Sequence, residues 1–242
     1  MGNLEKYFKM LSECNQVLLR SNDEKILARD ICDTVVNVGK FDSAFIGLLK
    51  GNRLNLEITS GILKPYSDKI VIAPDDPRHA SGASGLALKD GQTHIYNDLT
   101  YEKDYDPYRE IINETGLKAN MAVPIKVDDK IIGTVGIYSK RVGAFTQIEQ
   151  KLFEELAGDL AYGISSIRTR KRTETLNEML KSIRIANQRI AKEDKFEPLL
   201  EGFCEDLESA KFYYGVSILH EGRIYCAGDC CPVIKESIES GR

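Results

Sequence analysis

Apolar residues recur at helical spacing from the start of the chain. Residues 3–20 carry a stripe whose members are alternately four and three positions apart, which predicts an amphipathic helix with this stripe as its buried face. The stripe consists of Leu4, Phe8, Leu11, Asn15 and Leu18. The polar cluster at 21–23 is typical of a helix start and predicts a second helix that ends near Gly39.

Alternating apolar and polar positions then predict strands. Residues 42–59 indicate a β-hairpin around a Lys-Gly-Asn turn, and residues 118–139 indicate a second hairpin around Asp-Asp-Lys. Short strands are expected at 69–73 and 93–96, and residues 97–115 form a long polar and aromatic loop with a short helix near its end. Helices and mainly antiparallel strands in this order indicate the α+β class.

A long helix follows the second hairpin. Thr146 and Glu149 fit a capping box, and the helical pattern runs to about residue 192. A first apolar stripe consists of Leu152, Leu156, Leu160, Ile164 and Ile167. A second, in 4-3-4-3 spacing, consists of Leu176, Leu180, Ile183, Asn187 and Ile190. The two stripes are out of phase across the charged residues 168–174, so one continuous seam would need a stutter. The second stripe predicts a parallel two-helix coiled coil, hence a homodimer, in which Asn187 sets the register.

The end of the chain partly repeats its beginning. Residues 40–45 align with 211–216, and the turn at 50–51 aligns with 221–222, which gives a period of about 171 residues. The residues at 232–241 read as a helix of this second copy, and we expect the natural chain to continue beyond Arg242. The predicted organisation is a sensor domain at 1–167, a helical connector at 168–194 and the start of a second domain at 195–242.

Four segments in order resemble the GAF domain, a module that senses small molecules and signals. They are residues 11–20, residues 31–41, residues 85–92 with Asn97 and Asp98, and residues 122–125 with 132–138 and Phe145-Thr146. The resemblance implies a PAS-like or profilin-like antiparallel sheet of about six strands, with terminal helices on one face and a ligand pocket on the other. It is closest to the GAF domains of bacterial and archaeal multidomain sensors, which commonly precede histidine kinase, GGDEF or EAL modules.

Candidate ligand contacts gather around the predicted pocket. Tyrosines in a loop can close over a ligand with an apolar face and a hydroxyl, and an arginine can pair with an anionic group. Serines can approach from the opposite rim, and a strand methionine can form the floor. The candidates are Ser81, Ser84, Asn97, Asp98, Tyr101, Tyr105, Tyr108, Arg109 and Met121. Residues 81–85 are expected to be flexible and to lead into a short helix at 86–89. The alternatives are that the tyrosines only pack the loop and that Arg109 is solvated.

Composition narrows the function classes. A net charge of −4 does not favour broad nucleic-acid binding, and no apolar run approaches the length needed to cross a membrane. We therefore expect a cytoplasmic chain, or the soluble part of a longer membrane-attached one, with its six cysteines reduced. His79 and His94 lack the partners of a metal site, and Cys226, Cys230 and Cys231 read as small residues in a turn, so no metal or cofactor is predicted.

Three functions stay open at this stage. The leading hypothesis is a non-catalytic sensor that binds a small ligand and signals through the dimeric helix to a downstream output domain. The second is a dimerisation scaffold whose pocket is filled by side chains, which a void no larger than a few waters would favour. The third is an enzyme of the methionine sulfoxide reductase kind. The family resemblance implies that such enzymes need cysteines on the pocket loops, whereas Cys14 and Cys32 lie on predicted helices.

Overall fold

The chain folds into two compact units, residues 1–167 and residues 168–242. The computed structural model describes residues 2–51, 53–76, 80–193, 195–208 and 215–228. The predicted helix at 232–241 lies outside these residues, as do His79, Cys230 and Cys231. The helix α5 (Gln147–Ile190) contributes residues to both units, which are described one at a time.

The first unit alternates helices and hairpins in the predicted order. Its helices are α1 (Gly2–Arg20), α2 (Glu24–Asn37), α3 (Gly82–Asp90), α4 (Arg109–Thr115) and the first half of α5, with the 3-10 turns η1 (Lys64–Lys69) and η2 (Lys103–Tyr108). Its strands are β1 (Ser43–Lys50), β2 (Arg53–Gly61), β3 (His94–Tyr96), β4 (Ala119–Val127) and β5 (Lys130–Ser139).

The strands form one antiparallel sheet in the order β2-β1-β5-β4-β3. An isolated bridge joins Leu54 of β2 to Ile72, within the segment where the sequence predicted a further strand. With this bridge the sheet agrees with the expected antiparallel sheet of about six strands. Asp128 and Asp129 both have positive φ, 50° and 60°, which is the backbone that a tight two-residue hairpin turn requires.

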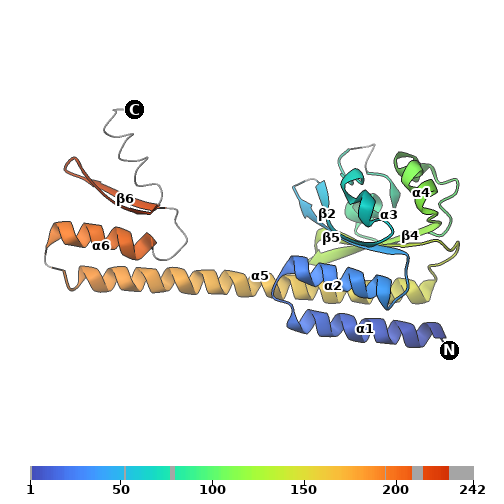
Figure 1. Cartoon of the computed structure of the whole chain (residues 1–242), viewed down its shortest axis with the longest axis horizontal. Coiled ribbons are helices and arrows are strands. Elements are labelled where there is room, and N and C mark those ends of the chain that lie inside the picture. The colour runs from blue at the N-terminus through green and yellow to red at the C-terminus, as the bar shows by residue number, and fades with distance from the viewer. Residues whose placement is uncertain (1, 52, 77–79, 194, 209–214, 229–242) are drawn as a thin grey trace. The chain divides into compact units, whose positions relative to one another are not determined.

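Helices cover the two faces of this sheet unequally. In Figure 1, α1, α2 and α5 lie on one side of the sheet, and the shorter α3 and α4 lie on the other. The side with the long helices holds the largest hydrophobic cluster, which includes a group of rings from α1, α2's exit loop and α5. Phe41 stacks on Tyr7 and Phe145 and meets Phe153 edge-on. The expected arrangement of terminal helices on one face is confirmed.

The face that α1 buries differs from the prediction. The buried residues are Tyr7, Met10, Cys14 and Val17, whereas Leu4 and Phe8 of the predicted stripe are 62% and 73% exposed. The helix is apolar on two adjacent sides, so periodicity alone located the helix but did not identify its inward side. Leu11 and Leu18 of the predicted stripe are partly buried against the same cluster, so the stripe lies at the edge of the buried face and only its N-terminal part is exposed.

The start of α5 is fixed as the sequence predicted. Glu149 accepts hydrogen bonds from the backbone N–H and the hydroxyl of Thr146, and the Thr146 hydroxyl accepts from the N–H of Ile148 at 3.2 Å, so the capping box is confirmed. Glu149 also accepts a 2.7 Å bond from the hydroxyl of Tyr7 on α1. Burial by itself would raise the pKa of Glu149, but the bonds from Thr146 and Tyr7 outweigh it and lower that pKa.

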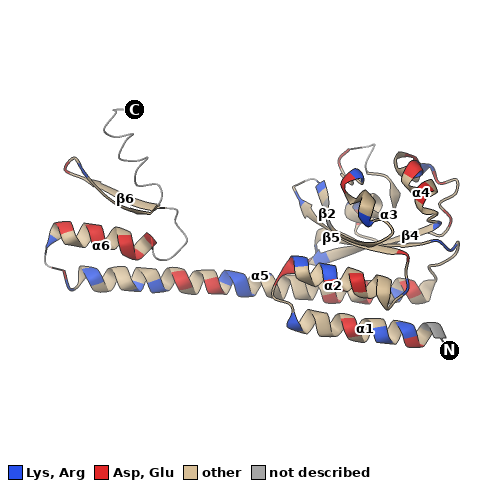
Figure 2. Cartoon of the chain, viewed as in Figure 1, with Lys and Arg blue, Asp and Glu red and all other residues tan. Residues whose placement is uncertain are grey.

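The predicted phase change along α5 has a structural reason. The first stripe, from Leu152 to Ile167, is buried in the core of the first unit. Residues 168–178 are exposed on all sides, and their side chains are charged or polar except for Leu176 (Figure 2). Leu180 and Ile183 of the second stripe are more than half exposed. The two stripes therefore need not form one seam, and no stutter is required.

The second unit contains the end of α5, the helix α6 (Phe196–Glu208) and a hairpin of β6 (Gly215–His220) and β7 (Arg223–Gly228). Arg189 donates two bonds to the carboxylate of Asp206, at 2.6 Å and 3.0 Å, and thereby ties α5 to α6. Cys226 is disulfide-bonded, which corrects the expectation that all cysteines are reduced, whereas Cys14, Cys32 and Cys204 are free.

Candidate functional site

A small cavity lies on the face of the sheet opposite the long helices. It has a volume of about 30 Å³, which is room for about two water molecules. Its walls come from the residues that flank η1, from α3, η2 and α4, and from outward-facing residues of β4 and β5, and they are mostly apolar. Of the residues predicted to contact a ligand, Ser81, Ser84, Tyr105 and Tyr108 lie at this cavity.

One wall is the first turn of α3. The sequence predicted a flexible segment at 81–85, but the helix already begins at Gly82. Gly82 has a φ of +79°, and a Cβ added at Gly85 would lie 2.1 Å from the carbonyl oxygen of Ala80. Gly82 is favoured by its left-handed backbone and Gly85 by its close approach to Ala80, and the segment that resembled a loop is an ordered helix start.

Tyr105 organises the polar side of the cavity. Its hydroxyl accepts a 3.0 Å bond from the N–H of Ala83 in α3 and donates to the Oδ1 of Asn120 in β4. The Asn120 amide nitrogen in turn donates to the carbonyl of Ile137. Burial raises the pKa of Tyr105 well above its ordinary value, so this hydroxyl stays protonated. Asn120 and Tyr138 also line the cavity, because they alternate along their strands with residues that face the long helices, but no local sequence signal pointed to them.

Two further polar groups border the cavity. Tyr108 donates its hydroxyl to the carbonyl of Val71 and so closes one rim, and burial raises its pKa to about 12. The hydroxyl of Ser84, which is only 5% exposed, has no hydrogen-bond partner. A buried hydroxyl without a partner is energetically unfavourable, and a molecule with a hydrogen-bonding group that entered the cavity would remove this deficit.

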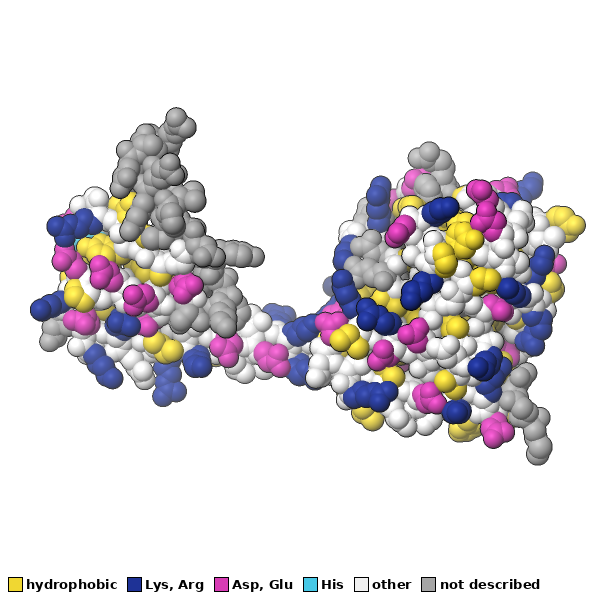
Figure 3. Space-filling view, in the orientation of Figure 1, with side chains coloured by type: hydrophobic (Ala, Val, Ile, Leu, Met, Phe, Trp, Pro, Cys, Tyr) yellow, Lys and Arg dark blue, Asp and Glu magenta, His cyan; other side chains and the backbone are white. Residues whose placement is uncertain are grey.

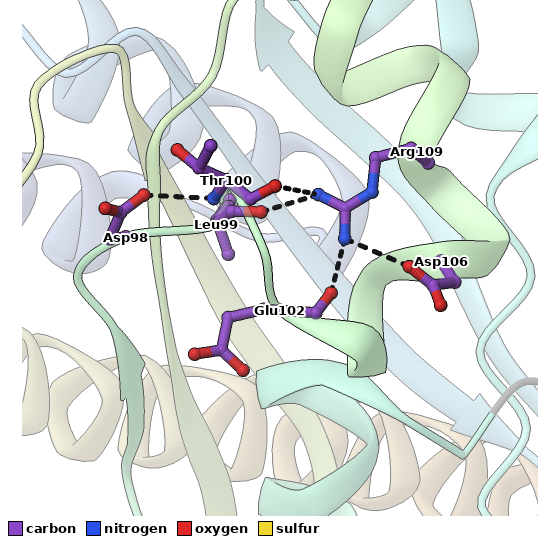
Figure 4. A network of polar contacts seen from close by, with 6 residues as sticks. All are labelled: Asp98, Leu99, Thr100, Glu102, Asp106 and Arg109. Atoms are coloured by element: carbon purple, nitrogen blue, oxygen red, sulfur yellow. Dashed lines mark hydrogen bonds and ion pairs between the residues drawn. The ribbon is translucent and has the colours of Figure 1, made fainter.

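Arg109 holds the loop rather than facing the cavity. Its guanidinium donates to the carbonyls of Leu99, Thr100 and Glu102 and to the carboxylate of Asp106 (Figure 4). These bonds occupy the guanidinium donors that were expected to pair with an anionic ligand. The geometry therefore corrects that expectation, and Arg109 is also not simply solvated.

Asn97, Asp98 and Tyr101 lie away from the cavity as well. Asn97 makes two bonds to the backbone of Phe145: its amide donates to the carbonyl at 2.8 Å, and its oxygen accepts from the N–H at 3.0 Å. Asp98 accepts from the N–H of Thr100, which shapes the turn, and Tyr101 is 90% exposed. The polar side chains of Asn97 and Asp98 therefore hydrogen-bond to the backbone and not to a group in the cavity.

Met121 is on the wrong side of the sheet to form the pocket floor. It is fully buried in the cluster beneath the long helices, together with Ala119 and Val123. Successive strand residues point to opposite faces, so the floor is formed by its neighbour Asn120 instead. The expectation for Met121 is corrected by one position.

Other parts of the described chain differ from this cavity in shape and lining. A shallow hollow of about 420 Å³ lies along the edge strand β2, between Arg53 and Asp68, and is open to solvent. No group of three or more metal-ligating side chains occurs among the described residues, and His94 bonds to Asp90 at 2.8 Å. None of the described helices combines the length and the apolar character needed to cross a membrane.

The comparisons with known proteins agree with this geometry. A sequence profile described as a GAF domain matches residues 21–165, which is more than half of the chain. The chain belongs to the GAF domain family. Its GAF domain thus has the sheet, the covering helices and the cavity described above. No curated protein matches the chain.

Solved structures share this fold at low sequence identity. The GAF domain of a phosphoenolpyruvate-protein phosphotransferase from Coxiella burnetii is 16% identical, with a TM-score of 0.60, and the match covers 71% of this chain and 99% of that one. The free methionine-R-sulfoxide reductase of Neisseria meningitidis, solved with its substrate, is 18% identical, with a TM-score of 0.57, covering 68% and 91%. The A. aeolicus nlh2 GAF domain in an inactive state is 14% identical, with a TM-score of 0.56, covering 67% and 98%.

Proposed function

We propose that this protein is a non-catalytic sensory module whose GAF cavity binds a small ligand and whose long helix passes the change to the second unit and on to an output module. One observation carries this proposal. Asn97, at the start of the loop that leads to the cavity, makes two hydrogen bonds to Phe145, two residues before α5 begins. A movement of this loop therefore acts directly on the start of the helix.

The connection continues from Phe145 into both terminal helices. Thr146 and Glu149 cap α5, and Glu149 receives the hydroxyl of Tyr7 from α1. A ligand that rearranged the loop at 97–108 would change the strain on this cap and so favour one position of the helices over another. The stripe from Leu176 to Ile190 is exposed and suits pairing with a second copy, so the proposed receiver of the movement is a dimeric helix.

The small size of the cavity favours the competing scaffold function. A void of about 30 Å³ has no room for a metabolite unless Tyr105 or Tyr108 moves. The unpartnered hydroxyl of Ser84 favours the sensor, because Ser84 lines the cavity and a ligand with a hydrogen-bonding group could become its partner. The ligand must therefore enter by displacing the loop, which is also the movement that the Asn97 bonds would transmit.

Sulfoxide reduction is less well supported. Cys14 of α1 and Cys32 of α2 are fully buried in the cluster on the long-helix side of the sheet, across the sheet from the cavity, and burial raises the pKa of the Cys14 thiol to about 12. A protonated thiol is a poor nucleophile, and among the residues that the structure describes no cysteine lines the cavity. We expect the full chain not to reduce free methionine-R-sulfoxide with a thiol reductant. Turnover that persisted in the double variant Cys14→Ser, Cys32→Ser would remove these two thiols from any mechanism.

Native mass spectrometry of the purified full chain tests the ligand. We expect a bound small-molecule mass on the wild type that is lost in Ser84→Val, whose larger side chain fills the cavity. The control Thr100→Val lies in the loop between β3 and η2, outside the cavity lining, and should keep the bound mass. If the wild type carries no bound mass, or if Ser84→Val retains it, the sensor function of this cavity is rejected in favour of the scaffold. Circular dichroism confirms that each variant is folded.

A further inference from the structure

A second space lies beside the cavity, at the edge of the sheet. It is the open hollow of about 420 Å³ along β2, an outermost strand of the sheet in Figure 1. Its lining mixes apolar side chains with the charged Arg53 and Asp68, as does the surface of the first unit in Figure 3. Ile70 lines both this hollow and the small cavity of about 30 Å³. Its side chain therefore forms part of the wall between the two spaces.

The segment that carries Ile70 is an incomplete strand. The sequence predicted a strand at 69–73, and the structure has one bridge there, in which the N–H of Leu54 donates to the carbonyl of Ile72 at 2.9 Å. Val71 is exposed and Ile72 is buried, which is the alternation of a strand with one covered face. Ile70 already has extended backbone, with φ −91° and ψ 110°. The segment therefore has the backbone and the side-chain pattern of a strand, but little of its ladder.

The bridge defines the register in which this ladder could grow. Antiparallel pairs that exchange hydrogen bonds recur every two residues, so the next such pair after Leu54 and Ile72 is Leu56 with Ile70. Leu56 and Ile70 both line the hollow, and both pack against the hydrophobic cluster that contains Leu54 and Ile72. Growth of the ladder by one pair would bring these two apolar side chains together and close the hollow without turning either of them to the other face of the sheet.

The present position of Ile70 is weakly held. Its N–H donates to the carbonyl of Ser67 at 3.4 Å, which is longer than the usual range of about 2.7–3.2 Å. This bond closes the last turn of η1, and 3-10 turns have poor hydrogen-bond geometry. The ends of the segment are fixed on both sides, because Tyr66 hydrogen-bonds to Glu114 of α4 and Ile72 is bridged to β2. Residues 67–71 can therefore move between two anchors, and a ladder bond to Leu56 would replace the long bond that is lost.

Tyr108 connects this segment to the opposite rim of the cavity. Its hydroxyl donates to the carbonyl of Val71, and its side chain lines the cavity. In a ladder that joins Ile72 and Ile70 to β2, the backbone groups of Val71 point away from β2, so the bond from Tyr108 can be kept. Tyr108, at the end of the loop at 97–108, would then follow the segment toward β2 and widen the cavity further.

We propose that residues 67–71 are a movable wall of the cavity, which pairs along β2 with Ile70 opposite Leu56 when a ligand enters. The movement takes Ile70 out of the cavity and into the hollow, so the small space gains volume that the large one loses. The proposal rests on the proposed function, because it describes how the cavity of that sensor admits its ligand. It also gives the reason why a cavity with room for about two water molecules can accept a larger molecule.

A disulfide across the hollow tests the paired position. The full-length double variant Leu56→Cys, Ile70→Cys is oxidised mildly beside the wild type. The matched control is Leu56→Cys, Ser67→Cys, because Ser67 lines the same hollow but is out of register. We expect the 56–70 disulfide to form at least tenfold faster than the control disulfide, since the Cα atoms of such a ladder pair lie about 5.5 Å apart, within the range of a disulfide. Equal rates, or no disulfide between 56 and 70, overturn the proposal.

Benzene then reports on the size of the cavity, because it enters apolar cavities that are large enough. Its dissociation constant is measured from the amide shifts of Ala83 and Ser84 in the 56/70 variant before and after oxidation. The lost isoleucine volume is the same in both forms, so their difference reports the pairing alone. We expect the oxidised form to bind benzene at least tenfold more tightly. Equal binding means that pairing does not enlarge the cavity, and the movable wall is then rejected.

Hydrogen exchange of the wild type gives a measurement without substitutions. On addition of benzene we expect exchange of the Ile70 amide to slow at least tenfold, and that of the Ile62 amide, which bonds to the carbonyl of Asp42 outside the segment, to stay unchanged. Benzene shifts at Ala83 without protection of Ile70 contradict the proposal. Native mass spectrometry of the wild type decides the sensor function separately, because a missing bound mass rejects the sensor while the benzene measurements still decide whether the wall moves.

Discussion

The two faces of the sheet in the first unit are packed in different ways. The face under α1, α2 and α5 holds a continuous apolar cluster with four interacting rings. The face under α3 and α4 divides into smaller clusters around the cavity and carries the buried amide of Asn120. Among the described residues, the hydroxyls of Thr59, Ser84 and Thr134 are buried and have no hydrogen-bond partner. All three side chains lie on the cavity face of the sheet.

Because they are packed differently, we expect the two faces to respond differently when a contact is changed. A densely packed apolar core responds to change as a whole, since interdigitated side chains leave few alternative arrangements. A face held by hydrogen bonds to loops can exchange one set of partners for another at lower cost. The helix face is therefore suited to transmit a movement, and the cavity face to accept one.

The largest expected effect is on the helix face. Phe153 is fully buried and packs edge-on against Phe41, so Phe153→Ala leaves a cavity in the dense core. We expect a loss of about 3–5 kcal/mol in the free energy of unfolding of the first unit, measured by hydrogen exchange of the slowest amides in β4 and β5.

The matched control lies on the outer side of the same helix. Tyr162 is 78% exposed, and Tyr162→Ala should change the same free energy by less than about 0.5 kcal/mol. A loss below about 1 kcal/mol for Phe153→Ala would mean that the core closes around the vacancy, and the rigid role assigned to this face would be wrong.

The next effect is on the cavity face. Tyr105→Phe removes the hydroxyl that joins Ala83 to Asn120 and leaves a buried N–H and a buried carbonyl oxygen without that partner. We expect a cost of about 1–3 kcal/mol, with faster exchange confined to α3 and the loop at 97–108. Tyr101→Phe, which removes an exposed hydroxyl, is the control. Exchange that accelerates equally in β4 and β5 would show that the two faces are not independent.

The fold was accessible from the sequence because its signals are local. Helix periodicity, the capping box at Thr146 and the two hairpin turns each depend on residues close together in the chain. The inward side of α1 was not accessible, because Phe8 and Met10 are both apolar and only the rest of the fold decides which one is buried.

The site was predictable only in part, for reasons of geometry. Ser84 and Tyr105 lie at the cavity because they belong to segments that cross the sheet face, although their binding of a ligand is still a prediction. Arg109 and Asn97 donate hydrogen bonds to backbone carbonyls, of Leu99 and Phe145 respectively. The positions of these carbonyls are set by the folded loop, so the sequence alone could not predict the contacts. Met121 was misplaced by one step, which in a strand reverses the face.

The smallest expected effect sharpens the comparison most. The Ser84 hydroxyl has no hydrogen bond to lose, so Ser84→Ala should leave stability within about 0.5 kcal/mol of the wild type or raise it slightly. Ser43→Ala is the matched substitution, because the Ser43 hydroxyl donates to the carbonyl of Ser60 and accepts from the N–H of Leu63, and it should cost about 1–3 kcal/mol. Both are measured by hydrogen exchange of the same amides, on protein freed of small molecules by denaturation and refolding. If Ser84→Ala lowers the free energy of unfolding by more than about 1 kcal/mol before this treatment but not after it, the Ser84 hydroxyl has a bound partner that the treatment removes. The cavity face is then completed by a molecule from outside the chain.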